Sequence, residues 1–168
     1  SRLIRIAEID SGLSREDLSE RIREHPQLVP LVTRIVFLAG TRGSDDVLRG
    51  LGSLLGTLAE NPARTDEAEV MLGVLEKLTN AHVQLLQLAK ALCGTTPRVD
   101  RETLLAGAPL PDTTARLALN DLLGMDLLAE VHTHLQRSSL RQVPQYEVTS
   151  SGDTVLAVLS SIAEAERA

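Results

Sequence analysis

The chain has 168 residues, 43% of them apolar, which is enough to bury the core of one domain or of two small ones. A formal net charge of −6 and a pI near 5.2 exclude a general attraction to polyanions, so any contact with nucleic acid must be local. With one Phe, one Tyr and no Trp, the chain lacks the aromatic platforms on which single-stranded nucleic acids stack. The single cysteine cannot form an internal disulfide, and no apolar run is long enough to span a bilayer, so we expect a cytoplasmic protein without membrane contact.

The beginning of the chain predicts three helices. A short amphipathic helix over residues 2–10 comes first. Ser14 then caps a second helix, with Asp17 completing a capping-box pattern and Pro26 ending the helix. Residues 28–39 are almost entirely apolar, which predicts a third helix buried at the centre of the fold.

Two further helices complete the first half. They are expected over residues 44–60 and from residue 65 to about residue 78. Each opens with a capping hydroxyl residue and with acidic side chains, which are favourable at the positive end of the helix dipole. We expect the five helices to form a bundle over residues 1–78 that is also a candidate oligomerisation region.

Three glycines lie inside the helix predicted over residues 44–60, although glycine costs about 1 kcal/mol relative to alanine in a helix interior. Close packing against the apolar helix over residues 28–39 would offset this cost. Alternatively, Gly52 and Gly56 would face a second subunit, because residues four apart share one side of a helix. The two glycines are therefore the candidate interface of a homodimer.

The second half predicts three more helices. They are expected over residues 80–92, 100–105 and 113–123, and Asp112 is the expected cap of the last one. Residues 107–111 contain Gly and Pro and form a tight turn between the second and the third of these helices. This pair of helices therefore predicts a helix-turn-helix.

A two-stranded hairpin and a last helix follow. Residues 127–135 alternate as a first strand, residues 136–142 form a polar loop, and residues 143–149 return as a second strand, where Pro144 indicates a free edge. The sequence thus predicts a mainly α protein. An N-terminal helical bundle is followed, over residues 79–168, by a C-terminal winged helix-turn-helix with a two-stranded β-wing.

A short motif marks the end of the hairpin. Tyr146, Val148, Thr149 and Gly152 form a Tyr-x-Val-Thr-x-x-Gly pattern at the corner between strand and helix. With this motif, residues 80–166 resemble the winged-helix domains of bacterial regulators of the multiple-antibiotic-resistance type. The N-terminal half is similar to the helical bundles of uncharacterised bacterial and phage-associated proteins, and this second resemblance implies no activity.

The first resemblance implies that the third helix of the module enters the major groove of duplex DNA, while the wing contacts phosphate or the minor groove. Arginine and asparagine are suited to the edges of guanine and adenine, respectively. The matching candidates are Thr113, Thr114, Arg116, Leu117 and Asn120 on the helix, and Arg137, Ser138, Ser139 and Arg141 in the wing.

The charge of this region argues in the opposite direction. From Thr95 onward, six arginines and no lysine stand against ten acidic residues, and Arg116 shares its helix with Asp112 and Asp121. Since affinity for duplex DNA comes largely from neutralised phosphates, the electrostatic attraction is small. Two functions therefore stay open. One is a regulator that binds duplex DNA as a homodimer, and the other is an adaptor whose acidic winged helix contacts a protein partner.

Nothing in the sequence indicates an enzyme, because no nucleophile, acid and base are placed together by a motif. His132 and His134 point to the same side of the predicted strand, but two ligands do not make a metal site, and a polar strand face also explains them. We expect Cys93 to act as a small apolar residue and His82 to lie on the surface of its helix. No cofactor and no metal are expected.

Overall fold

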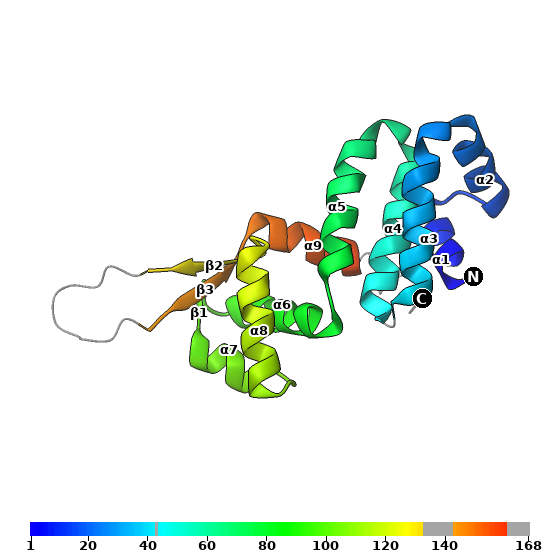
Figure 1. Cartoon of the computed structure of the whole chain (residues 1–168). Helices are drawn as coiled ribbons and strands as arrows, with labels where there is room; N and C mark the ends of the chain where they lie inside the picture. Colours follow the sequence, from blue (N-terminus) through cyan, green and yellow to red (C-terminus); the bar gives the residue numbers. More distant parts are fainter. Residues whose placement is uncertain (43, 133–142, 161–168) are drawn as a thin grey trace. The chain divides into compact units, whose positions relative to one another are not determined.

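The computed structural model describes residues 1–42, 44–132 and 143–160 (Figure 1). The described part is mainly helical, with a small three-stranded antiparallel sheet. The chain divides into two compact units. One contains Ser1–Thr79 and the end of the last helix from Ala157, and the other contains Asn80–Leu156. Among the described residues, none of the helices combines the length and the apolar character needed to cross a bilayer.

The first unit contains five helices before Thr79. The second of these helices begins with the predicted capping box. In it, Ser14 accepts a hydrogen bond from the Asp17 amide, and the Asp17 side chain accepts one from the Ser14 amide. Two short 3₁₀ turns, Pro26–Leu28 and Pro62–Arg64, precede the third and the fifth helix. The helices are α1 (Arg2–Ser11), α2 (Arg15–Glu24), α3 (Val29–Thr41), α4 (Asp45–Glu60) and α5 (Thr65–Lys77).

The starts of α4 and α5 differ from the prediction in one respect. Acidic residues occupy both first turns as expected, but neither helix has the expected hydroxyl cap. Ser44 is the residue before α4, and its buried hydroxyl makes no hydrogen bond within the described residues. Thr65 lies inside α5, and its hydroxyl donates to the carbonyl oxygen of Pro62 instead. The 3₁₀ turn before α5 places Thr65 one position too late to act as the cap.

The buried helix of this unit is α4. Ten of its sixteen residues are buried, whereas α3 buries only Leu31 and Ile35. The prediction of a buried central helix over residues 28–39 was therefore wrong. One side of α3 packs on α4 and α5, and its other side, which is equally apolar, stays exposed. Composition alone could not separate a helix buried on all sides from a helix buried on one.

Two of the three glycines of α4, Gly52 and Gly56, lie against α1 of the same chain, whereas Gly50 lies against Leu75 and Leu159. A Cβ atom at Gly52 would overlap the Ile6 side chain, and one at Gly56 would lie 3.1 Å from the carbonyl oxygen of Ala7. Glycine is required here because the two helices approach each other too closely for a side chain. This finding corrects both sequence hypotheses, since Gly52 and Gly56 face neither α3 nor a second subunit.

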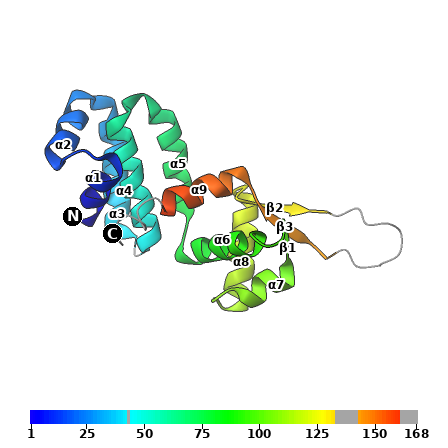
Figure 2. The same ribbon diagram turned by 180° about the vertical axis from the view of Figure 1, so that it is seen from behind.

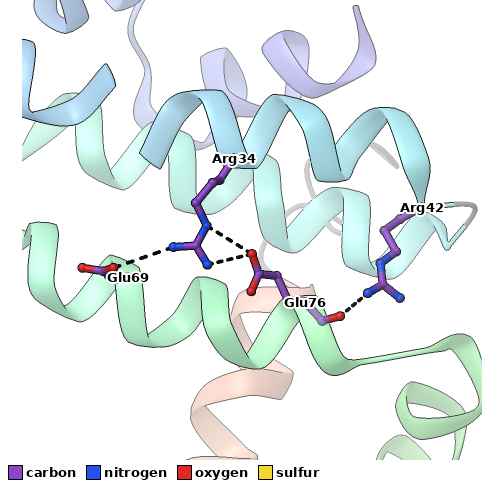
Figure 3. A network of polar contacts seen from close by, with 4 residues as sticks. All are labelled: Arg34, Arg42, Glu69 and Glu76. Atoms are coloured by element: carbon purple, nitrogen blue, oxygen red, sulfur yellow. Dashed lines mark hydrogen bonds and ion pairs between the residues drawn. The ribbon is translucent and has the colours of Figure 1, made fainter. Parts of the chain in front are cut away.

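Arginine side chains join α3 to α5 (Figure 3). Arg34 donates to Glu76 at 2.7 Å, and its guanidinium lies 3.7 Å from Glu69. Arg42 donates to the main-chain carbonyl oxygens of Glu76 and Leu78. Because the last carbonyls of a helix have no partner within the helix, Arg42 caps the C-terminal end of α5.

The second unit contains helices and all three strands. The order of the sheet is β1-β3-β2, with both neighbours antiparallel to β3. Figure 2 shows this unit from behind, with α7 beside α8 and β2 beside β3. The elements are α6 (Asn80–Cys93), β1 (Val99–Asp100), α7 (Arg101–Gly107), α8 (Asp112–Gly124), β2 (Leu128–Val131), β3 (Gln145–Val148) and α9 (Ser150–Ser160), of which the residues up to Leu156 belong to this unit.

The central position of β3 corrects the prediction that Pro144 marks a free edge. Tyr146 of β3 pairs with Val99 on one side and with Glu130 on the other. Pro144 lies just before the strand, where its missing N–H is not needed, and its carbonyl oxygen accepts a hydrogen bond from the Arg101 amide. The sequence did not predict β1, because a strand of two residues is too short to show an alternating pattern.

The motif at the end of the hairpin has a structural explanation. Tyr146 is buried, and this burial raises the pKa of its hydroxyl. The Thr149 hydroxyl donates to the carbonyl oxygen of Asp126 at 2.6 Å and accepts a hydrogen bond from the Gly152 amide at 2.9 Å. A Cβ atom at Gly152 would overlap the carbonyl oxygen of Leu127. The motif thus connects β3 to α9 over a path on which only glycine fits at position 152.

Candidate nucleic-acid interface

The helix residues that the sequence suggested for DNA contact lie on the exposed side of α8. The helix buries Ala115, Ala118, Leu119 and Leu122, and it packs chiefly against α6. The periodicity of an amphipathic helix places the remaining side chains on the opposite face. That face, called the α8 outer face below, consists of Thr113, Thr114, Arg116, Leu117 and Asn120, all of which are exposed.

The cation of the α8 outer face is held by a carboxylate on its own helix. Arg116 donates to Asp112 at 2.8 Å, and this hydrogen bond to the carboxylate raises the pKa of the guanidinium. Asp112 was expected to cap the helix, but it is the first residue of α8 and makes no capping bond, because Pro111 occupies the capping position. An exposed ion pair of this kind is worth little energy and exchanges readily.

The second carboxylate of α8 is bound by a histidine of α6. His82 is buried, and its Nε2 atom lies 3.1 Å from an oxygen of Asp121. The prediction that His82 lies on the surface was therefore wrong. Because α8 packs over α6 at this point, the imidazole is covered and needs a polar partner. The partner lies 39 positions away in the sequence, so no local pattern could reveal it.

A second guanidinium lies on the same side of the unit. Arg101, the first residue of α7, lines with Arg116 an open hollow of about 640 Å³, whose other charged residues are Glu102 and Asp112. The Nε atom of Arg101 is buried and has no hydrogen-bond partner among the described residues. Arg101 was missed in the sequence analysis. Its position at the start of the helix predicted over residues 100–105 was the available signal.

Several sequence candidates lie outside the described residues. They are Arg137, Ser138, Ser139 and Arg141 of the predicted wing, together with His134. His132 follows β2, and its Nε2 atom lies 3.9 Å from a carboxylate oxygen of Glu130. Within the described ranges, no three His, Cys, Asp or Glu residues are placed together as metal ligands would be.

No protein-family model, no curated protein and no solved structure matches the chain. A function must therefore be proposed from the chemistry of the described surface. Around α7 and α8, this surface presents hydroxyls, one amide and two guanidiniums, together with the carboxylates of Glu102, Asp112 and Asp121. Such groups form hydrogen bonds with phosphate oxygens and with the edges of bases.

Proposed function

We propose that the chain is a non-enzymatic regulator that binds duplex DNA through a winged helix-turn-helix. The order α6-β1-α7-α8-β2-β3 supports this assignment, because it is the order expected of a winged helix. The observation that best supports DNA binding is the α8 outer face. It gathers the uncharged hydrogen-bonding side chains of the helix and its one arginine at positions where none of them contributes to the core. In this function α8 is the recognition helix that enters the major groove.

The residues of the α8 outer face have complementary tasks. Arg116 and Asn120 are four residues apart, so both point to the same side about one turn from each other. The guanidinium is suited to guanine and the amide to adenine. In this proposal Arg101, on α7, contacts a phosphate beside the groove, which its position in the same hollow as Arg116 supports. DNA must displace Asp112 from Arg116, and the exposure of this ion pair keeps the cost of the exchange small.

The test is a titration of duplex DNA of random sequence with the protein. Binding is measured by fluorescence anisotropy at about 50 mM and at about 200 mM salt. Replacement of Arg116 by Ala should weaken binding by about tenfold or more, because a bidentate base contact or a phosphate contact is lost. Asp112→Asn should instead tighten binding by about threefold to tenfold, since it frees the guanidinium and removes a charge that repels phosphate.

The first unit offers a matched control. Arg64 and Glu67 form an ion pair with side-chain exposures of 52% and 67%, against 52% and 68% for Arg116 and Asp112. Arg64→Ala and Glu67→Gln should leave the affinity for DNA unchanged. The proposal is wrong if neither the wild type nor Asp112→Asn binds duplex DNA at the lower salt concentration. It is also wrong if Arg64→Ala weakens binding as much as Arg116→Ala.

One observation favours a second candidate, an adaptor whose winged helix contacts a protein. Leu117 is 61% exposed in the middle of the α8 outer face, beside an arginine that already has a carboxylate partner. An apolar side chain among neutralised charges is typical of the centre of a protein interface. The same titration decides between the two candidates, because an adaptor should not bind duplex DNA even when Asp112 is replaced by Asn.

A further inference from the structure

The outer side of α3 is apolar and exposed. Val29, Val36 and Phe37 lie on it, and Phe37, the only phenylalanine of the chain, is 69% exposed. Thr33 and Gly40 share this side, because they are three or four residues from the others. A Cβ atom at Gly40 would meet no other atom within 4 Å. We call these five residues the α3 outer face. Contiguous apolar surface of this kind indicates a contact with another molecule.

The α3 outer face has no charge. Arg34 is the one charged residue of α3, and it is turned toward α5, where Glu69 and Glu76 bind it (Figure 3). The chain as a whole has a net charge of −6, so two copies repel each other where acidic surfaces meet. The α3 outer face is a surface on which two copies can meet without placing like charges together.

The α3 outer face is also complementary to itself. An antiparallel contact with a twofold axis between Val36 and Phe37 would set each of these two residues opposite the other one in the second copy. It would likewise set Thr33 opposite Gly40 about one turn from the axis, so that a small side chain meets a residue without one. A contact in which the same patch serves both subunits is the commonest form of a homodimer interface.

We propose that the α3 outer face is the contact surface of a homodimer, with a second copy of the same chain as its occupant. A single helix face covers less than the area of about 1,200–2,000 Å² that is typical of stable interfaces. We therefore expect a weak dimer with a dissociation constant of about 1–100 μM. The proposal does not depend on DNA binding, because its residues lie in the first unit and its measurement contains no DNA.

The test is sedimentation velocity of the full chain over a range of concentrations that includes the expected dissociation constant. The wild type should shift from monomer to dimer as the concentration rises. Phe37→Glu should raise the dissociation constant about tenfold or more, since it places two like charges beside the twofold axis. Val70→Glu is the matched control, because Val70 is an apolar residue of α5 outside the α3 outer face. It is 72% exposed, against 69% for Phe37, and its replacement should leave the dimer unchanged.

A charge-reversal experiment separates a direct contact from a folding defect. Phe37→Glu and Phe37→Lys should each be monomeric alone, with circular dichroism spectra like that of the wild type. An equal mixture of the two should dimerise again, because each copy then places a charge of opposite sign beside the axis. The proposal is overturned if the wild type stays monomeric at every concentration, in which case the α3 outer face serves another partner. It is also overturned if Phe37→Glu dimerises as the wild type does.

Discussion

Single residues determine the path of the chain at the corner between β3 and α9. The carbonyl oxygen of Leu127 accepts a hydrogen bond from the Thr149 amide at 3.2 Å, and the main chain at Gly152 passes directly beside the same oxygen. Thr149 can cap α9 only if the chain turns this tightly, and the chain can turn this tightly only if position 152 has no side chain. A threonine followed by a glycine three residues later is therefore a requirement of the backbone. This requirement is independent of whether the unit binds DNA.

Gly152 should consequently tolerate no larger residue. Gly152→Ala is expected to lower the free energy of unfolding by about 1–3 kcal/mol, because the new methyl group overlaps the carbonyl oxygen of Leu127 and crowds Val148. Gly73→Ala is the control. It lies inside α5, where a Cβ atom would meet nothing within 4 Å, so it should raise the free energy of unfolding by about 0.5–1 kcal/mol. Urea unfolding measures both variants, and opposite signs are expected. A loss of stability at Gly73, or none at Gly152, would contradict this account.

At the scale of whole elements, the sequence predicted best what is determined locally. The helices follow from apolar periodicity and from caps such as Ser14 with Asp17, whose hydrogen bonds join residues three apart. The exposed side of α8 follows from the same periodicity, so local order along the chain was enough to identify it. The pairing of Arg116 with Asp112 is also a contact between neighbouring turns, but the sequence indicated a helix cap at Asp112 instead.

The sequence could not predict which elements lie next to each other. The packing of α1 on α4, the exposure of one side of α3 and the contact between His82 and Asp121 all depend on residues far apart in the chain. The same is true of Arg101, which lies beside Arg116 only because α7 and α8 pack together. A helical pattern shows that one side of a helix is apolar, but not which neighbour covers that side, or whether any does.

The hydrogen bonds of Asp100 at the start of α7 make the stability of the fold depend on pH. Asp100 accepts hydrogen bonds from the amide and from the hydroxyl of Thr103, at 2.9 and 2.7 Å, and these bonds lower the pKa of its carboxyl group. A group whose pKa is lower in the folded than in the unfolded chain stabilises the fold at pH values above its ordinary pKa, about 4. This stabilisation is lost as the pH falls through the lowered value.

Asp100→Asn isolates this effect, because asparagine retains an oxygen that can accept from the Thr103 amide but has no charge to lose. The wild type should be more stable than the variant at neutral pH, and the difference should shrink as the pH falls from about 5 to about 3. Urea unfolding at a series of pH values measures it. A difference that stays constant over this range would show that the carboxylate of Asp100 does not stabilise α7 through its charge.

At the scale of the whole molecule, the chain divides its apolar residues between two compact units. The core of the first is built on the buried leucines of α4 together with Leu72 and Leu75 of α5. That of the second lies between α6 and α8, where Leu86 and Leu119 are fully buried. Separate cores imply that one unit can lose its packing while the other retains it, because cooperative unfolding follows shared buried contacts.

Two core substitutions test this independence. Leu72→Ala and Leu119→Ala each remove a fully buried side chain and should each cost about 2–5 kcal/mol within their own unit. Hydrogen exchange measured by mass spectrometry should show faster exchange in α3 to α5 for Leu72→Ala and in α6 to α8 for Leu119→Ala, with the other unit unchanged in each case. If either variant accelerates exchange in both sets of helices to the same extent, the two units unfold as one. A change in the α8 outer face would then affect the α3 outer face as well, and the DNA titration and the dimer measurement would have to be interpreted together.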